Sequence, residues 1–247
     1  MPRVRADILL MHRGLAESRE SAQRLIMAGR ARVGTTVLVK PATLLDEGAP
    51  IILDAPERFV SRGGHKLQAA LDAFGVEPRG RACLDLGAST GVFTDCLLQA
   101  GADSVLAVDV GRAQLHQRLR EDPRVTLIEG TNARNLPPLP GALTLFVADL
   151  SFISLRKVLP SVADRLAPGT EGVVLLKPQF EAGPADVPRG GVIRDATVRE
   201  RVLVGFQSWA GAAGWRIASS IACPIHGGDG NIEFLIHLFT PERISAC

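Results

Sequence analysis

Four ionisable residues stand where side chains of their type can do chemistry. Lys177 ends the apolar run "VVLLK", Asp149 ends "LFVAD", Glu233 opens "EFLIHLF", and Lys66 comes early in a helix predicted over 62–74. Each residue alone is typical of a solvated strand end or a surface charge. A lysine seated against apolar residues near a second cation has a lowered pKa, however, and can then accept a proton. The chemistry therefore depends on whether other elements bring the four residues together.

A glycine-containing turn predicts a cofactor site. The run "LDLGASTGVF" follows a strand-like segment and carries Asp85, Gly87, Ser89 and Gly91. It resembles a dinucleotide fingerprint, except that Ser89 replaces the middle glycine, which lets the backbone approach a pyrophosphate. A ligand without pyrophosphate does not need that glycine. The pattern D-x-G-x-x-x-G therefore favours S-adenosylmethionine, with the loop backbone meeting its amino-acid tail.

Residues farther along the chain extend the predicted cofactor site. Asp109 ends the next strand-like run, where a carboxylate accepts hydrogen bonds from ribose hydroxyls. Asn132, in "EGTNARN", is placed either to meet the adenine or to act as a turn residue. Phe93, two residues after Gly91, and Val110, next to Asp109, complete the predicted set of cofactor-binding residues.

The elements that must position these residues follow an alternating pattern. The strand-like runs are 82–87, 104–110, 124–130, 143–150, 172–177, 215–221 and 232–239, and the predicted helices are 62–74, 91–100, 112–119, 154–166 and 196–213. Such alternation predicts an α/β fold with a doubly wound, mostly parallel seven-stranded sheet. No helix separates the last two runs, which are therefore expected to form an antiparallel pair. Ligands of such sheets bind beyond the carboxyl ends of the strands, where Asp149 and Lys177 would lie.

The N-terminal part has a different pattern and a different charge. Helices are predicted over 6–14 and 18–28, with short strands within 31–45 and 49–54. Residues 1–40 contain eight basic and three acidic side chains, a net charge of +5, whereas the remaining residues contain 20 basic and 23 acidic ones. A basic α+β module on a near-neutral body favours an anionic partner.

These patterns predict a domain organisation and an interface for phosphates. We expect a phosphate-binding domain over 1–53, a polar linker over 54–60 and a second domain, with the cofactor site, over 61–247. Arg5, Arg19 and Lys40 are expected to contact phosphates, and Arg62, which enters the second domain, is a candidate bridge to the same anionic partner. Within the second helix, Arg19 and Gln23 are expected on the outward side, opposite the stripe of Ala22, Leu25, Ile26 and Gly29.

Composition argues against several classes of protein. No stretch approaches the roughly 18 apolar residues of a membrane span, and the first residues lack the pattern of a signal peptide. The four cysteines have no paired spacing, which is typical of reduced thiols in a cytoplasmic protein. The five histidines are scattered, so no metal site is expected.

Several motifs are similar to those of a known family. They are "VSRGGHKL", "DLGASTGVFTDCLLQAGA", "VADLSFISL", "LLKPQFEAG" and "GNIEF". Together with the order Lys-Asp-Lys-Glu, they resemble the FtsJ-like ribose 2′-O-methyltransferases and, more narrowly, the TlyA family, which has an N-terminal RNA-binding module of a ribosomal-protein type. The resemblance covers nearly the whole chain. It implies S-adenosylmethionine as cofactor, ribosomal RNA or ribosomal subunits as partner, and a cytidine 2′-hydroxyl as the group methylated.

The resemblance also implies roles for the four charged residues. By the family pattern the catalytic set is Lys66, Asp149, Lys177 and Glu233. Lys177 is expected to act as the base or to orient the hydroxyl, and Lys66 to be the neighbouring cation. Asp149 and Glu233 are expected to hold the two ammonium groups and to keep buried positive charge paired.

Three other functions stay open from the sequence. One is a membrane-active cytolysin, a label historically attached to this family. Another is an RNA-binding factor without catalysis, and a third is a methyltransferase for a protein or a small molecule. Incubation with labelled S-adenosylmethionine and either rRNA or ribosomal subunits would separate these possibilities.

Overall fold

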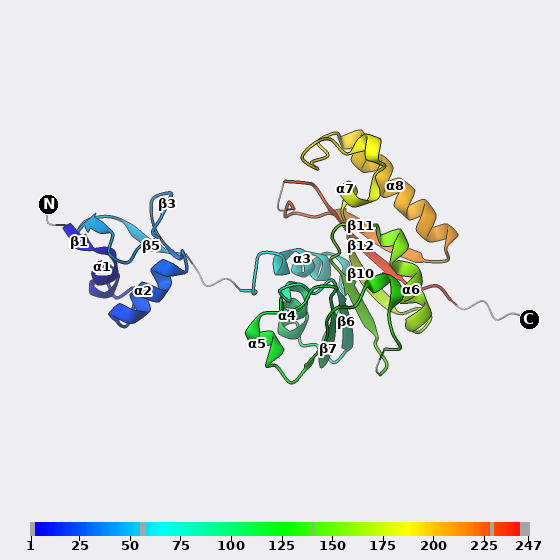
Figure 1. Cartoon of the computed structure of the whole chain (residues 1–247), viewed down its shortest axis with the longest axis horizontal. Coiled ribbons are helices and arrows are strands. Elements are labelled where there is room, and N and C mark those ends of the chain that lie inside the picture. Colours follow the sequence, from blue (N-terminus) through cyan, green and yellow to red (C-terminus); the bar gives the residue numbers. More distant parts are fainter. Residues whose placement is uncertain (1–2, 55–57, 140, 228–229, 243–247) are drawn as a thin grey trace, which may run out of the picture. The chain divides into compact units, whose positions relative to one another are not determined.

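The chain folds into two compact units, residues 1–58 and 59–247. The computed structural model describes residues 3–54, 58–139, 141–227 and 230–242 (Figure 1). The boundary between the units falls inside the predicted linker 54–60, whose residues 55–57 lie outside the described residues.

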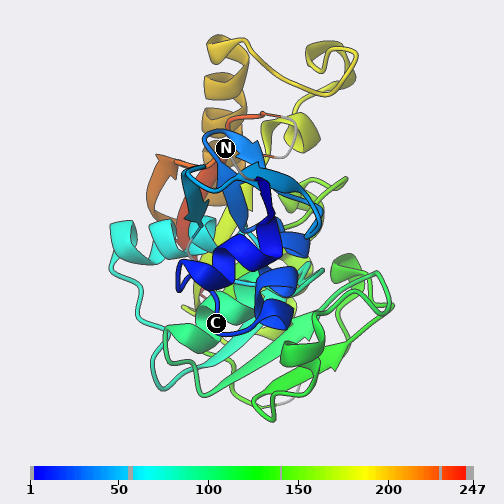
Figure 2. The ribbon, with the colours of Figure 1, turned by 90° about the vertical axis from the view of Figure 1, so that its left-hand side faces the viewer.

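The described residues of the small unit form two helices and five short strands. They are β1 (Arg3–Arg5), α1 (Ala6–His12), α2 (Arg19–Met27), β2 (Ala31–Val33), β3 (Thr36–Val37), β4 (Leu44–Asp46) and β5 (Ile51–Leu53). Strand β2 pairs antiparallel with both β3 and β5, and β1 pairs antiparallel with β4. Helices α1 and α2 pack against each other through a core that includes Leu10 and Ile26 (Figure 2). The pairing of β1 with β4 was not predicted.

Local interactions set both ends of the second helix. The Ser18 side chain accepts a hydrogen bond from the Ser21 N–H at 3.1 Å and so caps the start of α2. Gly29, just past the end of α2, has a φ of +68°, a conformation that favours glycine.

The larger unit is an α/β domain around one sheet, as predicted. Its strands are β6 (Ala82–Leu86), β7 (Ser104–Val108), β8 (Val125–Ile128), β9 (Leu145–Ala148), β10 (Glu171–Leu176), β11 (Arg216–Ala222) and β12 (Phe234–Phe239). They form a seven-stranded sheet in the order β11-β12-β10-β9-β6-β7-β8. Strands β6 to β10 run parallel, whereas β12 is antiparallel to both β10 and β11. The predicted antiparallel pair at the end of the chain is therefore confirmed.

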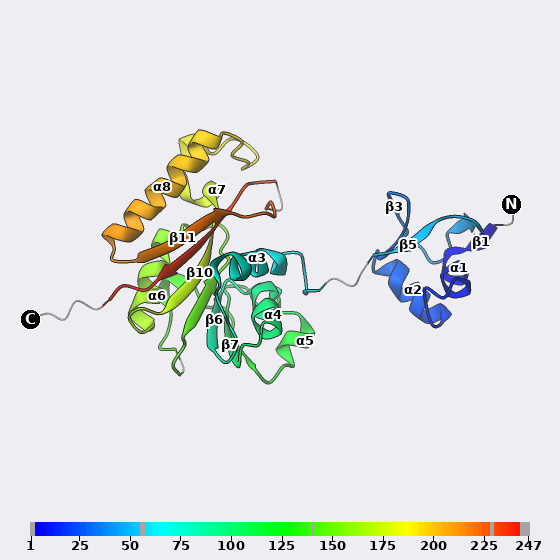
Figure 3. The same cartoon turned by 180° about the vertical axis from the view of Figure 1, so that it is seen from behind.

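Helices cover both faces of this sheet (Figure 3). They are α3 (Gly64–Phe74), α4 (Val92–Gln99), α5 (Gln117–Arg120), α6 (Leu159–Arg165), α7 (Pro178–Glu181) and α8 (Ala196–Ala212). Alternate strand residues supply two separate cores: Leu84 and Leu86 pack with α6 and α8, whereas Cys83 packs with α3 and α4. The continuous apolar strands of the sequence are thus buried on both sides.

Two predicted helices differ from the structure. The predicted helix 112–119 is helical only from 117, where α5 (Gln117–Arg120) begins, because side chains hold the preceding segment as a loop. The carboxylates of Asp109 and Glu129 accept the N–H groups of Gly111 and Ala113 at 2.6 and 2.7 Å, and Ala113 has a φ of +56°. The predicted helix 154–166 is divided into a 3₁₀ turn, η2 (Leu155–Lys157), and α6.

Candidate active site

A cavity of about 870 Å³ lies where the order of the parallel strands changes direction. Strand β6 is flanked by β7 on one side and by β9 on the other, so the chain winds outward from β6 in both directions. Loops that follow such neighbouring strands leave a crevice at their carboxyl ends. The cavity is lined by the segments after β6, β7, β8 and β9.

The structure brings five of the eight predicted cofactor residues to this cavity. Those that line it are Gly87, Ser89, Asp109, Val110 and Asn132, whereas Asp85, Gly91 and Phe93 are not among the lining residues. The turn has little spare space, because a side-chain carbon at Gly87, where φ is +80°, would lie 2.5 Å from the backbone oxygen of Asp149. Gly91 begins α4 with a φ of +91° and packs against Leu119.

Ser89 and Asp109 shape the part of the cavity predicted to hold the ribose. Ser89 has a φ of +48°, so the residue that replaces glycine still adopts the left-handed conformation. Its N–H donates to Asp109 Oδ2 at 2.7 Å, while the N–H of Gly111 donates to Oδ1. Each carboxylate oxygen keeps a second lone pair for a ligand hydroxyl. Asn132 lines the cavity and caps the turn η1 (Ala133–Asn135), where its Oδ1 accepts the Arg134 N–H.

Asp85 lies beneath the glycine turn, inside the protein. Thr94 Oγ1 of α4 donates to Asp85 Oδ2 at 2.6 Å, and Oδ1 has no hydrogen-bond partner among the described residues. Burial raises the pKa of this carboxyl to about 7. Alternation along β6 turns its side chain to the same face as Cys83, toward α4, so Asp85 is placed to support the turn from below.

The four charged residues form two ion pairs. Lys177 Nζ lies 2.6 Å from Asp149 Oδ1 and donates a hydrogen bond to Ser151 Oγ at 2.9 Å. Lys66 Nζ donates to Glu233 Oε2 at 2.6 Å, and only 11% of the Lys66 side chain and 3% of the Glu233 side chain are exposed. Asp149 also lines the cavity. Each buried charge thus has a partner of opposite sign.

Strand register places the two pairs at one end of the sheet. Leu176 of β10 is paired with Phe234 of β12, so Lys177 and Glu233 occupy the next positions on these two strands. The backbone of Glu233 accepts the N–H of Cys223, which follows β11. Burial raises the pKa of the Cys223 thiol, and Lys66, Glu233 and Asp149 all act electrostatically on this thiol. Members of both pairs therefore lie within electrostatic range of this one thiol.

Comparison with known proteins assigns the fold and the site to a family. The pattern of the FtsJ-like methyltransferases matches residues 59–239. The chain is 45% identical over 242 residues to the 16S/23S rRNA (cytidine-2′-O)-methyltransferase TlyA of Mycobacterium tuberculosis, covering 96% of this chain and 90% of that protein. The chain belongs to the TlyA family of FtsJ-like methyltransferases.

Two further relatives of this TlyA-family chain carry a different label. Hemolysin A of Brachyspira hyodysenteriae is 39% identical, with 95% of this chain and 99% of that protein covered. A solved structure described as a putative hemolysin from Streptococcus thermophilus has a TM-score of 0.75 and 41% identity, over 98% of this chain and 90% of that one. In the described part of this chain, no helix has the length and apolar character needed to cross a membrane.

Family membership settles the class of reaction and the cofactor. The protein is a methyltransferase that uses S-adenosyl-L-methionine. The cavity fits that ligand, since the tight turn at Gly87, the carboxylate of Asp109 and the amide of Asn132 line one continuous space. Within the described residues, no group of three or more His, Cys, Asp and Glu side chains gathers as metal ligands would.

Three residues of this TlyA-family site were not identified from the sequence. Ser151 bonds to Lys177, and Phe152, with 90% of its surface exposed and a φ of +63°, lines the cavity. Glu181 of α7 is buried and accepts hydrogen bonds from Ser154 Oγ at 2.7 Å and from the Leu155 N–H at 2.6 Å. Burial raises its pKa. The motifs "DLSF" and "KPQFE" contain these residues, but only the folded chain shows their contacts.

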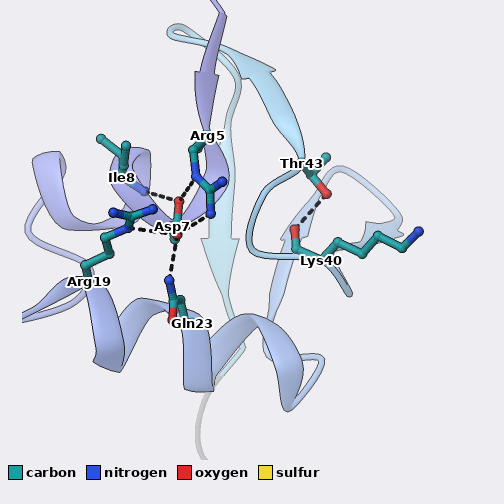
Figure 4. Close-up of polar contacts among 7 residues, drawn as sticks. All are labelled: Arg5, Asp7, Ile8, Arg19, Gln23, Lys40 and Thr43. Atoms are coloured by element: carbon teal, nitrogen blue, oxygen red, sulfur yellow. Dashed lines mark hydrogen bonds and ion pairs between the residues drawn. The ribbon is translucent and has the colours of Figure 1, made fainter.

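The predicted RNA-contacting residues differ in their surroundings. Arg5 and Arg19 both bond to the buried carboxylate of Asp7, whereas the side chain of Lys40 extends away from this group (Figure 4). Gln23 also donates to Asp7. About half of the Arg19 side chain is exposed, as expected, whereas Gln23 turns toward the buried carboxylate. A buried carboxylate needs donors, and the second helix supplies them. Arg62 is exposed in the turn before α3.

Proposed function

We propose that this protein methylates the ribose 2′-hydroxyl of a cytidine in ribosomal RNA. The observation that carries the proposal is the placement of Lys177–Asp149 and Lys66–Glu233 at one end of the sheet, with Asp149 lining the cavity. A relative that is 45% identical is named a 16S/23S rRNA (cytidine-2′-O)-methyltransferase, which supports the substrate. The 2′-hydroxyl would be held between the ion pairs and the cavity.

The two lysines and two acids divide the work of activating a hydroxyl. Bound S-adenosyl-L-methionine supplies an electrophilic methyl group on a sulfonium. A ribose hydroxyl is a weak nucleophile. Lys177 orients it and, in its neutral amine form, accepts its proton. Lys66 is the second cation and stabilises negative charge that develops on the oxygen. Asp149 and Glu233 hold the ammonium groups in place, and Ser151 fixes the direction of Lys177 Nζ.

The small unit would supply RNA affinity. It carries Arg5, Arg19 and Lys40, and Arg62 follows it in the chain. These side chains would contact phosphates, which set orientation without reading sequence, while the site in the larger unit takes the target nucleotide out of its stack. Because the proposed substrate is ribosomal, we expect the protein to work in the cytoplasm on ribosomal subunits.

Methyl transfer from labelled S-adenosyl-L-methionine tests the substrate. We expect label in ribosomal RNA when subunits or rRNA are supplied, and a stop at a cytidine when the product is mapped by primer extension under limiting nucleotide. Label found in ribosomal protein, or in no macromolecule, would contradict the proposal. Base-selective digestion that placed the methyl group on the base would reject the 2′-hydroxyl as acceptor.

Two substitutions at Lys177 separate its two proposed tasks. Lys177→Ala removes both the cation and the base, and should lower kcat by about 10²-fold or more, with little change in S-adenosyl-L-methionine binding measured by calorimetry. Lys177→Arg keeps a cation that cannot lose its proton in a protein. Equal losses in both variants would identify Lys177 as the base, whereas substantial activity in the arginine variant would limit it to orienting the hydroxyl. Near wild-type kcat in both would reject the assignment.

A further inference from the structure

The small unit contains a buried carboxylate that the proposed chemistry does not use. Asp7, in the first turn of α1, is fully buried, yet its two oxygens accept bonds from three side chains and from the Ile8 N–H (Figure 4). Arg5 donates through Nε to Oδ1 at 3.0 Å and through Nη2 to Oδ2 at 2.9 Å. Arg19 Nε and Gln23 Nε2 donate to Oδ2 at 3.1 and 3.0 Å.

This carboxylate joins three elements. Arg5 ends β1, Asp7 lies on α1, and Arg19 and Gln23 lie four residues apart on one face of α2. The hydrogen bonds from Arg5 hold the pKa of Asp7 well below its usual range, so the group is charged at neutral pH. The two guanidinium groups are thereby fixed on one anion although Arg5 and Arg19 are fourteen residues apart in the chain.

Both guanidinium groups keep donors that Asp7 does not use. Arg5 contacts Asp7 through Nε and Nη2, which leaves Nη1, and Arg19 contacts it through Nε alone, which leaves both terminal nitrogens. The side chains are 36% and 52% exposed, so these nitrogens can meet solvent or a ligand. A planar fork held by its Nε edge is preorganised to bond a phosphate with its outer edge.

We propose that Asp7 is a positioning residue for RNA: it holds Arg5 and Arg19 as one two-guanidinium site for a phosphodiester group. This rests on the proposed function, in which both arginines contact RNA. If Asp7 positions the arginines, loss of its charge should weaken RNA binding, which is the opposite of what the change in net charge alone predicts. Removing an acid makes the unit more basic and, by long-range attraction alone, should tighten RNA binding. Loss of positioning should weaken it, because two long side chains must then be ordered on binding.

The test is the kinetics of methyl transfer by the full chain. Asp7→Asn keeps the shape of the side chain and removes its charge, and Glu17→Gln, at an exposed position of the same unit, removes an equal charge as a matched control. We expect Asp7→Asn to raise KM for the RNA substrate about tenfold, the order of the cost of ordering two arginine side chains, with kcat within twofold. Glu17→Gln should leave KM unchanged or lower it. A lower or unchanged KM in Asp7→Asn would overturn the inference.

A second comparison distinguishes positioning from a loss of folding. In the Arg5→Ala/Arg19→Ala background, adding Asp7→Asn should change KM by less than twofold, because the residues on which Asp7 acts are gone. A further large rise in KM would mean that Asp7 only maintains the fold of the unit, and would reject the inference. If Arg5→Ala/Arg19→Ala itself leaves KM unchanged, the proposed RNA contact fails instead. If that variant raises KM while Asp7→Asn does not, only the positioning role fails.

Discussion

At the scale of single residues, the described part of the chain buries ionisable groups in two ways: beside a partner of opposite charge, or with a shifted pKa. Lys66 and Glu233 neutralise each other at a distance of 2.6 Å. Asp85 is fully buried beside Thr94 rather than beside a cation, and burial raises its pKa to about 7. An ion pair makes stability sensitive to the loss of one partner, whereas an unpaired carboxyl with a raised pKa makes stability depend on pH.

Asp85→Asn should make the stability of the ligand-free protein less dependent on pH. The folded-state pKa of Asp85 lies above its ordinary value of 3.8, so the folded state binds more protons between roughly pH 4 and 7. Wild-type stability therefore falls as pH rises through this window. The difference between variant and wild type should shift in favour of the variant from pH 5 to pH 8, by about 2–3 kcal/mol. Denaturant unfolding at both pH values measures it, and parallel stability–pH curves would contradict it.

Lys66→Met should be more destabilising than loss of the whole pair. The single substitution leaves the buried carboxylate of Glu233 without its cation, which costs about 3–5 kcal/mol. The double variant Lys66→Met/Glu233→Met replaces the pair by apolar groups of similar size, so most of the stability should return while methyl transfer should not. Unfolding curves and activity of the three proteins test this. A double variant less stable than the single one would refute it.

At the scale of elements, strand register and one buried acid position the site. Lys177 and Glu233 face each other because β10 and β12 are antiparallel with Leu176 opposite Phe234. A slip of one residue would turn one of these side chains to the other face of the sheet. Glu181 then ties α7, which follows Lys177, to the segment after β9 that lines the cavity.

Glu181→Ala should weaken cofactor binding without removing any residue that lines the cavity. The substitution leaves Ser154 Oγ and the Leu155 N–H without their acceptor, so the segment that includes Asp149 and Phe152 should lose its fixed conformation. We expect the Kd for S-adenosyl-L-methionine to rise about tenfold, which corresponds to the removal of one or two hydrogen bonds. Calorimetry with Glu200→Ala, an exposed position on α8, provides the control. An unchanged Kd would show that Glu181 does not hold the cavity-lining segment after β9 in place.

At the scale of the whole molecule, the proposed function assigns RNA binding to one unit and catalysis to the other. The larger unit contains the cavity and both ion pairs, whereas the small unit contains the basic residues of the first forty positions. Their separate cores indicate that each unit is stabilised mainly by its own contacts. The two activities should therefore be separable.

Deletion of residues 1–53 should lower RNA affinity much more than cofactor affinity. The deletion removes Arg5, Arg19 and Lys40, and the slope of log K against log salt should fall by about 0.7–0.9 for each phosphate that the shortened protein no longer neutralises. Binding titrations between 50 and 200 mM salt, roughly the range over which such interactions weaken, measure the slope. Calorimetry with S-adenosyl-L-methionine checks that the larger unit is folded. Equal losses of affinity for RNA and for cofactor would show that the units are not independent.

Local sequence patterns were sufficient for most elements of this protein. Ser18 caps α2 by a bond three residues away, and the apolar strands are recognisable because each is buried on both faces. The pattern failed where distant side chains override helix propensity, as in 112–116, which is held open by carboxylates from Asp109 and Glu129. A motif also does not show which of its side chains turn inward: Asp85 and Phe93 are buried and do not line the cavity.

The sequence by itself determined the alternation of strands and helices, the glycine turn after β6, and the presence of two lysines and two acids at element ends. These follow from propensity and periodicity, which act over a few residues. Only the tertiary structure decided which lysine meets which acid, that Ser151 bonds to Lys177, and that Arg5 and Arg19 share Asp7. Such interactions join residues up to 167 positions apart, and sheet register and helix packing, rather than any local preference, set their geometry.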